Sequence, residues 1–537
     1  MDDALIQAAE HALHDGDLRR VESLCRQTLE TAPQDSDAFG LLGKLAYQMG
    51  DAEAAALCFQ QAIIIDGNRP ALHNHLGTAL KELGQWEAAI AAFRQALALQ
   101  PDNDDAAYNL GTAWLQQGRH EAAAATFEAV LTRHPDHADT LNNLGVALHG
   151  LGRLEAAAAA YRRALAAQPD HADAHNNLGA LYQETYRLDE AILCHRTALE
   201  LRPDFAAAHM NYARLLLLQG LYASGWKEYA WRTHPSQPEP VFVYPYPFPP
   251  WEGEPLAGKT LLVHAEQGLG DEIMYASILP EIVAEAGHCI IECNQRLEAL
   301  FRRSFPAATV IGVNRNQSEW KTQAAQWVDQ APPVDYQMPI GSLPRQRRAA
   351  AVDFPRHGGY LQADPQRAAD WRQRLTVLGG GLKIGISWRG GTAKTGGARR
   401  SMTLDQWRPL LETPDAHFIN LQYDSGPEEL AAFREQSGIT LHHWPEAIDD
   451  YDETAALIAS LDLVISVCTA AVHLAGALGR PTWVFTPAMP EWPYGLWGET
   501  LPWYPAVRLF RQVRGEDWEA VVARAARALS AFSRRHG

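Results

Sequence analysis

The first two-fifths of the chain alternates apolar helical stretches with polar turns at a fixed step of 34 residues. Each unit predicts two amphipathic helices joined by a tight turn, and about seven such units fit in residues 1–233. The first helix of each unit carries a small residue at the same position, and a leucine precedes each glycine of this column. Its members are Gly43, Gly77, Gly111, Gly145, Gly179 and Ala213. Turn glycines and closing prolines keep the same step. A stack of helical hairpins offers an extended surface for holding another chain.

One column inside these repeats is polar where packing does not require a polar residue. Its members stand two residues before the small-residue column and are Asn109, Asn143, Asn177 and Asn211. An Asn side chain can donate to a peptide carbonyl and accept from a peptide N–H together. We therefore expect an acceptor groove for an extended polypeptide. The alternative is that these amides hydrogen-bond within the stack.

After the repeats the pattern changes twice. Residues 234–258 hold eight prolines and several aromatic residues, which excludes helix and predicts a stiff strap docked on a domain. From Lys259 onward, short apolar runs alternate with helical segments. This alternation predicts two Rossmann-like lobes with parallel sheets, over residues 259–378 and 379–537, facing a cleft. The strand-like runs are TLLVHA, HCIIEC, ATVIGV, KIGISW, HFINLQ, LDLVISV and PTWVFT.

Composition excludes some classes of function. The net charge is −18, and residues 1–234 hold 30 acidic and 18 basic residues, which argues against a general nucleic-acid binder. The six cysteines form no zinc pattern with the histidines, so no metal is expected. The acidic N-terminus lacks a signal-peptide core, and His473 and Arg480 interrupt the longest apolar stretch. These features predict a cytoplasmic protein without a membrane span, with a homo-oligomer left open.

Two turns at predicted strand ends carry candidate chemistry. In residues 264–271, Gly268 and Gly270 allow a tight turn, and Asp271 at the helix start can take a proton from an acceptor hydroxyl. Glu266 is a rival base, and Asp271 is alternatively a simple helix cap. In residues 387–401, backbone amides and cations suit a diphosphate, with a solvated loop as the alternative. The side chains of interest there are Arg389, Lys394, Arg400 and Ser401.

Two further segments follow later strands. A helix that starts near Thr469 offers the amides of Thr469 and Ala470 to a phosphate. His473 lies one turn further on, and a core histidine is its alternative role. The proline- and aromatic-rich residues 487–497 include Trp492, which can flank a base or sugar by stacking, or can simply pack its loop.

The repeat pattern resembles the tetratricopeptide repeat, and its Asn column resembles the asparagine ladder of the O-GlcNAc transferase repeats. Over residues 258–515 a second set of motifs resembles the heptosyltransferase-like glycosyltransferases. These motifs are Gly270-Asp271 with Leu279-Pro280, the strand at 384–388, Arg400-Ser401 through Trp407, and Thr469 to His473 followed by Gly479-Arg480-Pro481. The layout is similar to that of the O-GlcNAc transferases, although the C-terminal nucleotide-binding motif of that family is not found.

The resemblance implies a two-lobed GT-B fold and inverting, metal-independent transfer from a nucleotide sugar, which is a substrate, to a hydroxyl acceptor. It implies that Asp271 is the base, that Arg400 neutralises the donor diphosphate, and that the helix at Thr469 meets the nucleotide. Cys468 stands where the family usually has Asp, and the step from Asp271 to Pro280 is longer than in the lipopolysaccharide enzymes. An inactive scaffold, and a transferase acting on a glycolipid or polysaccharide, are the alternatives.

Overall fold

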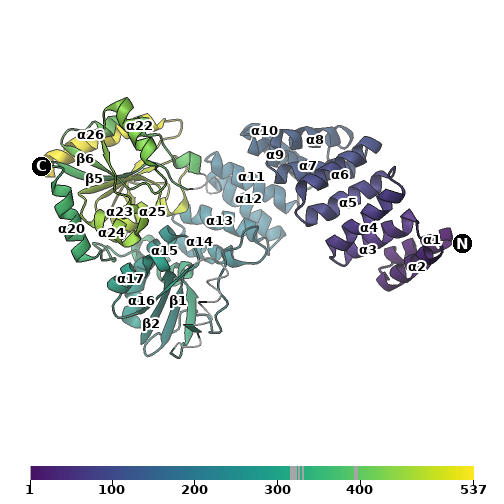
Figure 1. Cartoon of the computed structure of the whole chain (residues 1–537), viewed down its shortest axis with the longest axis horizontal. Coiled ribbons are helices and arrows are strands. Elements are labelled where there is room, and N and C mark those ends of the chain that lie inside the picture. Colours follow the sequence, from purple (N-terminus) through teal and green to yellow (C-terminus); the bar gives the residue numbers. More distant parts are fainter. Residues whose placement is uncertain (1, 315–322, 324–326, 329–331, 392–396, 537) are drawn as a thin grey trace. The chain divides into compact units, whose positions relative to one another are not determined.

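The computed structural model describes residues 2–314, 323, 327–328, 332–391 and 397–536. The chain forms two compact units, Met1–Asp204 and Phe205–Gly537, and each is taken by itself below. The first unit consists of antiparallel helical pairs (Figure 1). Its helices are α1 (Asp2–His14), α2 (Leu18–Thr31), α3 (Ser36–Gln48), α4 (Ala52–Ile65), α5 (Pro70–Glu82), α6 (Trp86–Leu99), α7 (Asp104–Gln116), α8 (His120–Arg133), α9 (Ala138–Gly150), α10 (Leu154–Ala167), α11 (Ala172–Glu184) and α12 (Leu188–Leu201).

The glycine column of the first unit makes room for a ring from the second helix of the same pair. A Cβ at Gly145 would lie 2.4 Å from Cε1 of Tyr161, and one at Gly111 would lie 2.5 Å from Cε1 of Phe127. No real Cβ packs this closely, so a glycine is required where the two helices approach. The same contact recurs in the pairs Gly43–Phe59, Gly77–Phe93 and Gly179–His195.

The turn between the two helices of a pair needs a left-handed residue. At the end of α3 the Asp51 N–H donates to the Ala46 carbonyl, and Gly50 between them has φ of 80°. This is the Schellman arrangement, in which glycine avoids the Cβ penalty. Tyr186 occupies the same slot after α11 with φ of 64°, so an L side chain there carries strain.

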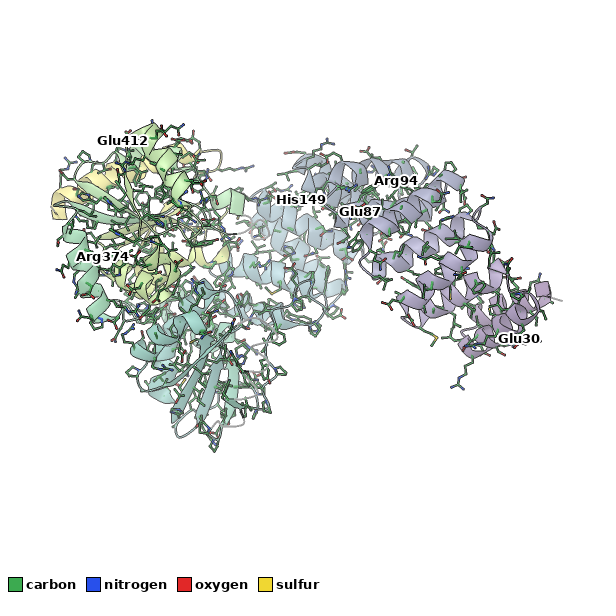
Figure 2. All side chains as sticks on the ribbon, in the orientation of Figure 1. Glu30, Glu87, Arg94, His149, Arg374 and Glu412 are labelled. Atoms are coloured by element: carbon green, nitrogen blue, oxygen red, sulfur yellow. The ribbon has the colours of Figure 1, made fainter. Side chains whose placement is uncertain are left out.

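Charged side chains of neighbouring repeats pair at the surface of the first unit, and Figure 2 labels one member of each of two such pairs, Glu87 and His149. Arg119 Nη2 lies 2.9 Å from Glu87 Oε1, and His149 Nε2 lies 2.8 Å from Glu184 Oε2. Such exposed pairs contribute little stability each, so the apolar interior holds the stack together.

The second unit begins with one more helical pair, α13 (Ala206–Leu218) and α14 (Tyr222–Tyr229), followed by the short helix η1 (Ala230–Thr233). The repeats were predicted to end at residue 233, whereas the second compact unit already begins at Phe205. The reason is packing, because Leu217, Trp226 and Tyr229 lie in the same buried core as the helices of the α/β region.

The first sheet has four parallel strands in the order β3-β2-β1-β4. The strands are β1 (Thr260–His264), β2 (His288–Asn294), β3 (Thr309–Val313) and β4 (Tyr336–Pro339). Residues 234–258 cover one face, where Tyr246 packs with Leu262, Ile290 and Val313. Short helices accompany this sheet, namely α15 (Leu269–Tyr275), η2 (Ala276–Ile278), α16 (Leu279–Glu285), η3 (Gln295–Leu297), α17 (Glu298–Ser304), η4 (Ile340–Ser342), α19 (Leu343–Arg347) and η5 (Ala351–Asp353).

The second sheet has seven strands in the order β10-β11-β9-β8-β5-β6-β7, and only β10 is antiparallel. Without β10 this is the doubly wound order of a dinucleotide-binding sheet, whose connections diverge between β5 and β8. The strands are β5 (Leu382–Ser387), β6 (Ala416–Asn420), β7 (Leu441–His442), β8 (Leu463–Val467), β9 (Thr482–Thr486), β10 (Thr500–Leu501) and β11 (Tyr504–Arg511).

Helices lie on both faces of the second sheet (Figure 1). Those packed with Ile384 and Ile386 are α21 (Leu404–Leu411), α22 (Pro427–Ser437) and α26 (Trp518–His536). The remaining helices are α20 (Pro365–Thr376), η6 (Gly397–Arg400), α23 (Glu446–Asp449), α24 (Tyr451–Ala459), α25 (Ala470–Ala477) and η7 (Trp492–Tyr494).

The helical repeats and the parallel sheets predicted from the sequence are confirmed, and each of the seven apolar runs contains a strand. Strands β4, β7, β10 and β11 were not predicted, because their sequences are short or interrupted by charged residues. Among the described helices, none has the length and apolar character needed to cross a membrane.

Candidate functional site

The ends of β5 and β8 meet at the point where the connections of the second sheet diverge. A Cβ at Gly390 would lie 2.7 Å from the Cys468 carbonyl oxygen and 3.0 Å from Cγ2 of Thr469. The Gly390 N–H lies 3.2 Å from Ser401 Oγ, which donates to the Gly397 carbonyl at 2.7 Å. The structure therefore brings Ser401 and Thr469, from two of the predicted segments, to one place. Lys394 lies outside the described residues.

Thr469 precedes α25 with extended backbone and makes no side-chain cap to the helix. Its Oγ1 lies instead 2.9 Å from Ser466 Oγ. The amides in the first turn of α25 are thus left without a side-chain cap, which is the condition for anion binding at a helix N-terminus.

The turn after β1 reaches this same helix. A Cβ at Gly270 would lie 3.2 Å from Cδ2 of His473 and 3.5 Å from Cα of Ala470, so α15 and α25 approach closely at this glycine, and a larger residue would require the His473 ring to shift slightly. Asp271 is half-buried, and its Oδ2 lies 3.4 Å from the place of a Cβ at Gly268. Asp271 therefore stands in the first turn of α15, next in the chain to the residue that contacts α25.

The two carboxylates of the β1 turn have different surroundings. Glu266 is fully buried and forms an ion pair with Arg232, whose Nη2 lies 2.7 Å from Oε1 and 2.9 Å from Oε2. The Gly341 N–H donates to the same Oε1 at 3.0 Å. These contacts occupy Glu266, whereas Asp271 is partly accessible, so the base role fits Asp271 better than its rival.

His473 is buried, and its Nδ1 lies 3.1 Å from the Tyr504 hydroxyl. Burial lowers the pKa of His473 to about 4. The ring is therefore neutral at neutral pH and supplies no positive charge to a diphosphate. This matches the alternative role of a core histidine, which also packs against Gly270.

Two of the cations predicted to bind a diphosphate, Arg389 and Arg400, differ in their surroundings. Arg389 forms an ion pair with Glu429, with Nη2 2.9 Å from Oε2, and this pair raises the pKa of Arg389 although burial lowers it. Arg400 ends η6 and lies close enough to Cys468 to lower the pKa of that thiol, although burial raises it to about 12.

Trp492 packs against α14, the last helix of the repeats. Its ring centroid lies 5.3 Å from that of Trp226 and 5.9 Å from that of Tyr229, both in edge-on geometry. This matches loop packing, the alternative to stacking on a base or sugar.

Three members of the Asn column bond to the preceding repeat of the first unit. Asn109 Nδ2 donates to Asn74 Oδ1 at 3.0 Å, and Asn177 Nδ2 donates to Asn142 Oδ1 at 2.9 Å. Asn143 Nδ2 donates to the Tyr108 hydroxyl at 3.0 Å. Half of their donor capacity is thus used within the stack, as the alternative expected, and a second N–H remains on each amide. Asn211 lies on α13 in the second unit and is half-buried.

Two residues that sequence reasoning missed hold the site in place. Arg232 pairs with Glu266, and Gln422 is buried at the end of β6. Gln422 Oε1 accepts from the Ser387 hydroxyl and from the N–H groups of Trp388 and Arg389 at 2.9 to 3.0 Å. Their partners lie more than 30 residues away in the chain, and no local pattern marks such pairs.

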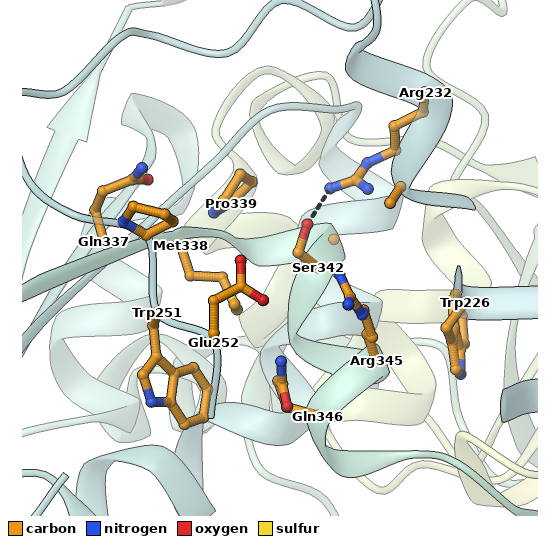
Figure 3. A pocket seen from close by; sticks show the side chains of 13 residues that line it. Trp226, Arg232, Trp251, Glu252, Gln337, Met338, Pro339, Ser342, Arg345 and Gln346 are labelled. Carbon is orange, nitrogen blue, oxygen red and sulfur yellow. Dashed lines mark hydrogen bonds between the residues drawn. The ribbon is translucent and has the colours of Figure 1, made fainter. Parts of the chain in front are cut away.

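A small cavity of about 110 Å³ lies beside Arg232 (Figure 3). Trp251 and Glu252 of the strap, Ser342 and Gln346 line part of it. Within the described part of the chain, no three His, Cys, Asp or Glu side chains gather in a group that could hold a metal.

Comparison with known proteins places the repeat family in the first unit. Residues 36–69, 75–138, 116–172 and 160–192 match models of the tetratricopeptide repeat. These matches lie within the N-terminal 200 residues, which carry tetratricopeptide repeats.

Protein FlbA of Caulobacter vibrioides (strain ATCC 19089 / CIP 103742 / CB 15) is 37% identical over 329 residues, which are 60% of this chain. The chain spans about half of that protein, 54% of its length. The matched stretch is longer than the first unit, so the similarity extends into the second unit.

Among solved structures, YrrB, described as a TPR protein with an unusual peptide-binding site, is 20% identical with a TM-score of 0.31 and covers 34% of this chain and 95% of its own. Pseudomonas aeruginosa pilF is 20% identical with a TM-score of 0.35 and covers 38% and 94%.

Proposed function

We propose that the second unit is a glycosyltransferase of the two-lobed GT-B type, which transfers a sugar from a nucleotide sugar to a polypeptide hydroxyl. The observation that carries the proposal is the contact of Gly270 with Ala470 and His473. Asp271 follows Gly270 directly in the chain, and Ala470 begins helix α25 at the switch point of a doubly wound sheet. A proton acceptor and an anion site side by side suit sugar transfer from a nucleotide diphosphate.

In the proposed reaction, the first-turn amides of α25 and the Arg400 guanidinium bind the donor diphosphate. Asp271 removes the proton of the acceptor hydroxyl, whose oxygen attacks the anomeric carbon. The bond from that carbon to the diphosphate oxygen breaks, and the helix N-terminus stabilises the charge that develops on the leaving group. Attack opposite the leaving group inverts the anomeric centre, and the proposed reaction is metal-independent.

The acceptor is proposed to be a polypeptide bound by the tetratricopeptide repeats. The support is the remaining hydrogen-bonding capacity of Asn109, Asn143 and Asn177, which are only half-buried. Removing residues 1–204 tests the acceptor class, because this cut follows the unit boundary and keeps α13 and α14 with the core they complete. Transfer to a protein should be lost, whereas transfer to a glycolipid or polysaccharide should persist.

The donor and the base are tested in sequence. A thermal-shift screen with ADP-, UDP-, GDP- and CMP-sugars identifies the donor, since a ligand that binds the folded state raises its stability. With that donor, Asp271→Asn should abolish transfer while donor binding persists. Glu266→Gln is the matched variant, because a buried amide can still accept from Arg232 and the Gly341 N–H. Unchanged transfer in Asp271→Asn, or an equal loss in Glu266→Gln, would remove Asp271 from the base role.

A second function, a repeat scaffold with an inactive α/β region, is favoured by one observation. Arg389, predicted to bind the diphosphate, is paired with Glu429 and reaches Asp424 as well. A scaffold should neither transfer sugar nor hydrolyse any nucleotide sugar. Release of free sugar from the donor by the purified protein therefore decides against it.

A further inference from the structure

The last helical pair of the repeats, α13 and α14, continues into η1, and this segment bonds directly to the turn that carries Asp271. Arg232 on η1 is 3% exposed, and its Nε and Nη2 donate to Glu266 at 2.7 to 3.1 Å. At the end of α14, the Tyr229 hydroxyl donates to Gln267 Oε1 at 3.0 Å. Glu266 and Gln267, which immediately precede Gly268, are thus both hydrogen-bonded by the segment from α14 to η1.

All three nitrogens of the Arg232 guanidinium donate hydrogen bonds in this position. Nη2 also donates to Ser342 Oγ at 2.7 Å (Figure 3). Nη1 donates to the Tyr229 carbonyl at 3.3 Å. Burial lowers the pKa of Arg232, but the Glu266 charge outweighs it and the pKa is raised. A buried, planar and bidentate ion pair fixes the orientation of both partners, which a lysine could not reproduce.

The backbone after β4 packs closely against Glu266. A Cβ at Gly341 would lie 2.1 Å from Glu266 Oε1, so only a glycine lets η4 lie against the carboxylate. Without Arg232 the carboxylate would be a buried charge without its counter-ion, and it would have to shift or take up a proton. Either change acts on a turn in which Asp271 is only five residues further along the chain.

The same helical segment contacts a loop of the second sheet. Trp492 of η7 packs edge-on against Trp226 and Tyr229. The segment from α14 to η1 therefore contacts the turn after β1 and the loop after β9, at the carboxyl ends of strands in both sheets.

We infer that Arg232 is a positioning residue for the Gly268–Asp271 turn, so that the last helical pair is a working part of the transfer site rather than of the acceptor-binding stack. The inference rests on the proposed function. Arg232 acts through Glu266, while Tyr229 of the same segment holds Gln267.

The test compares Arg232→Met with Arg348→Met in the full-length protein. Arg348 is equally buried and pairs with Glu281 instead of a residue of the turn, so its loss controls for the general effect of removing a buried arginine. Two quantities are measured: hydrogen exchange of the amides of residues 267–271, and the split between kcat and the donor KM. Arg232→Met should raise exchange in the turn and lower kcat about 100-fold, the loss expected for a displacement of about 1 Å, with the donor KM unchanged. Arg348→Met should do neither.

Two further variants keep the inference testable if Arg232→Met does not fold. Arg232→Lys keeps the charge but loses the fork, and it should give an intermediate kcat with raised exchange in the turn. The double variant Arg232→Met with Glu266→Gln removes the orphaned charge, so stability should recover while kcat stays low. Exchange in the turn that is no higher in Arg232→Met or Arg232→Lys than in Arg348→Met would overturn the inference. A wild-type protein that binds nucleotide sugars and transfers none would instead refute the proposed function.

Discussion

His195 is the one polar residue in the ring column of the first unit, and its replacement by Phe tests how that column works. The other members are Phe59, Phe93, Phe127 and Tyr161, and each lies over the glycine of its own pair. His195 is completely buried over Gly179, with Nδ1 3.1 Å from Asn176 Oδ1. Because an amide oxygen only accepts, Nδ1 carries the proton, and the buried Nε2 has no hydrogen-bond partner among the described residues.

The effect of pH on this site follows from the pKa of His195, which burial lowers from 6.5 to about 4. A depressed pKa in the folded state means that the folded protein binds its proton less readily than the unfolded chain does. The stability is therefore complete above pH 6.5 and is lost as the pH falls from 6.5 to about 4. At 1.36 kcal/mol per unit, the loss is about 3 kcal/mol. At neutral pH, His195→Phe removes an unsatisfied buried nitrogen and should stabilise this pair by about 1 kcal/mol.

The assay is native-state hydrogen exchange of the α11 and α12 amides in wild type and His195→Phe, at pH 7 and at pH 4.5. The difference between the two proteins is compared across pH, so the contributions of all other titrating groups cancel. The difference should grow by about 2 kcal/mol at the lower pH, in favour of the variant. A difference that stays constant between the two pH values would refute the assignment of a buried, neutral imidazole.

Two more substitutions test the repeat geometry. Gly145→Ala should destabilise α9 and α10 by about 1 to 3 kcal/mol in hydrogen exchange, because the added methyl meets three atoms of the Tyr161 ring within 2.9 Å; Gly67→Ala, with its nearest contact at 3.3 Å, is the control. Tyr186→Gly should raise the stability of α11 and α12 by about 1 kcal/mol, because φ of 64° suits glycine, and no gain would mean that the tyrosine side chain offsets its strain.

The repeats could be predicted closely because their characteristic residues recur at a fixed spacing along the sequence. Gly145 and Tyr161 belong to columns that recur at the 34-residue step, so each contact between them is repeated along the chain. The strands could be predicted because buried parallel strands are short apolar runs. Strand β4 has the sequence YQMP and contains no apolar run. It lies at the edge of its sheet, where Pro250 of the strap pairs with its Gln337.

The candidate site could be predicted only in part. The turns at strand ends were recognisable from glycines and from the helix that follows, and the structure brings the turns at Gly270 and Ala470 together. The partners of the charged side chains were not recognisable. Glu266 and Asp271 look alike in the sequence, and only the burial of Arg232, 34 residues earlier in the chain, separates them. Arg389 likewise meets Glu429 across 40 residues.

Cys468 shows how a departure from a motif can agree with its chemistry. In the proposed transferase, Cys468 stands at the junction between strand and helix where heptosyltransferase-like glycosyltransferases usually have Asp. Burial raises the pKa of the Cys468 thiol to about 12, so the side chain is neutral, and its Sγ lies 3.7 Å from the Phe485 carbonyl. A neutral side chain at the end of β8 removes a negative charge within reach of Arg400. The field at this helix N-terminus is then more positive, which favours an anionic ligand such as a diphosphate.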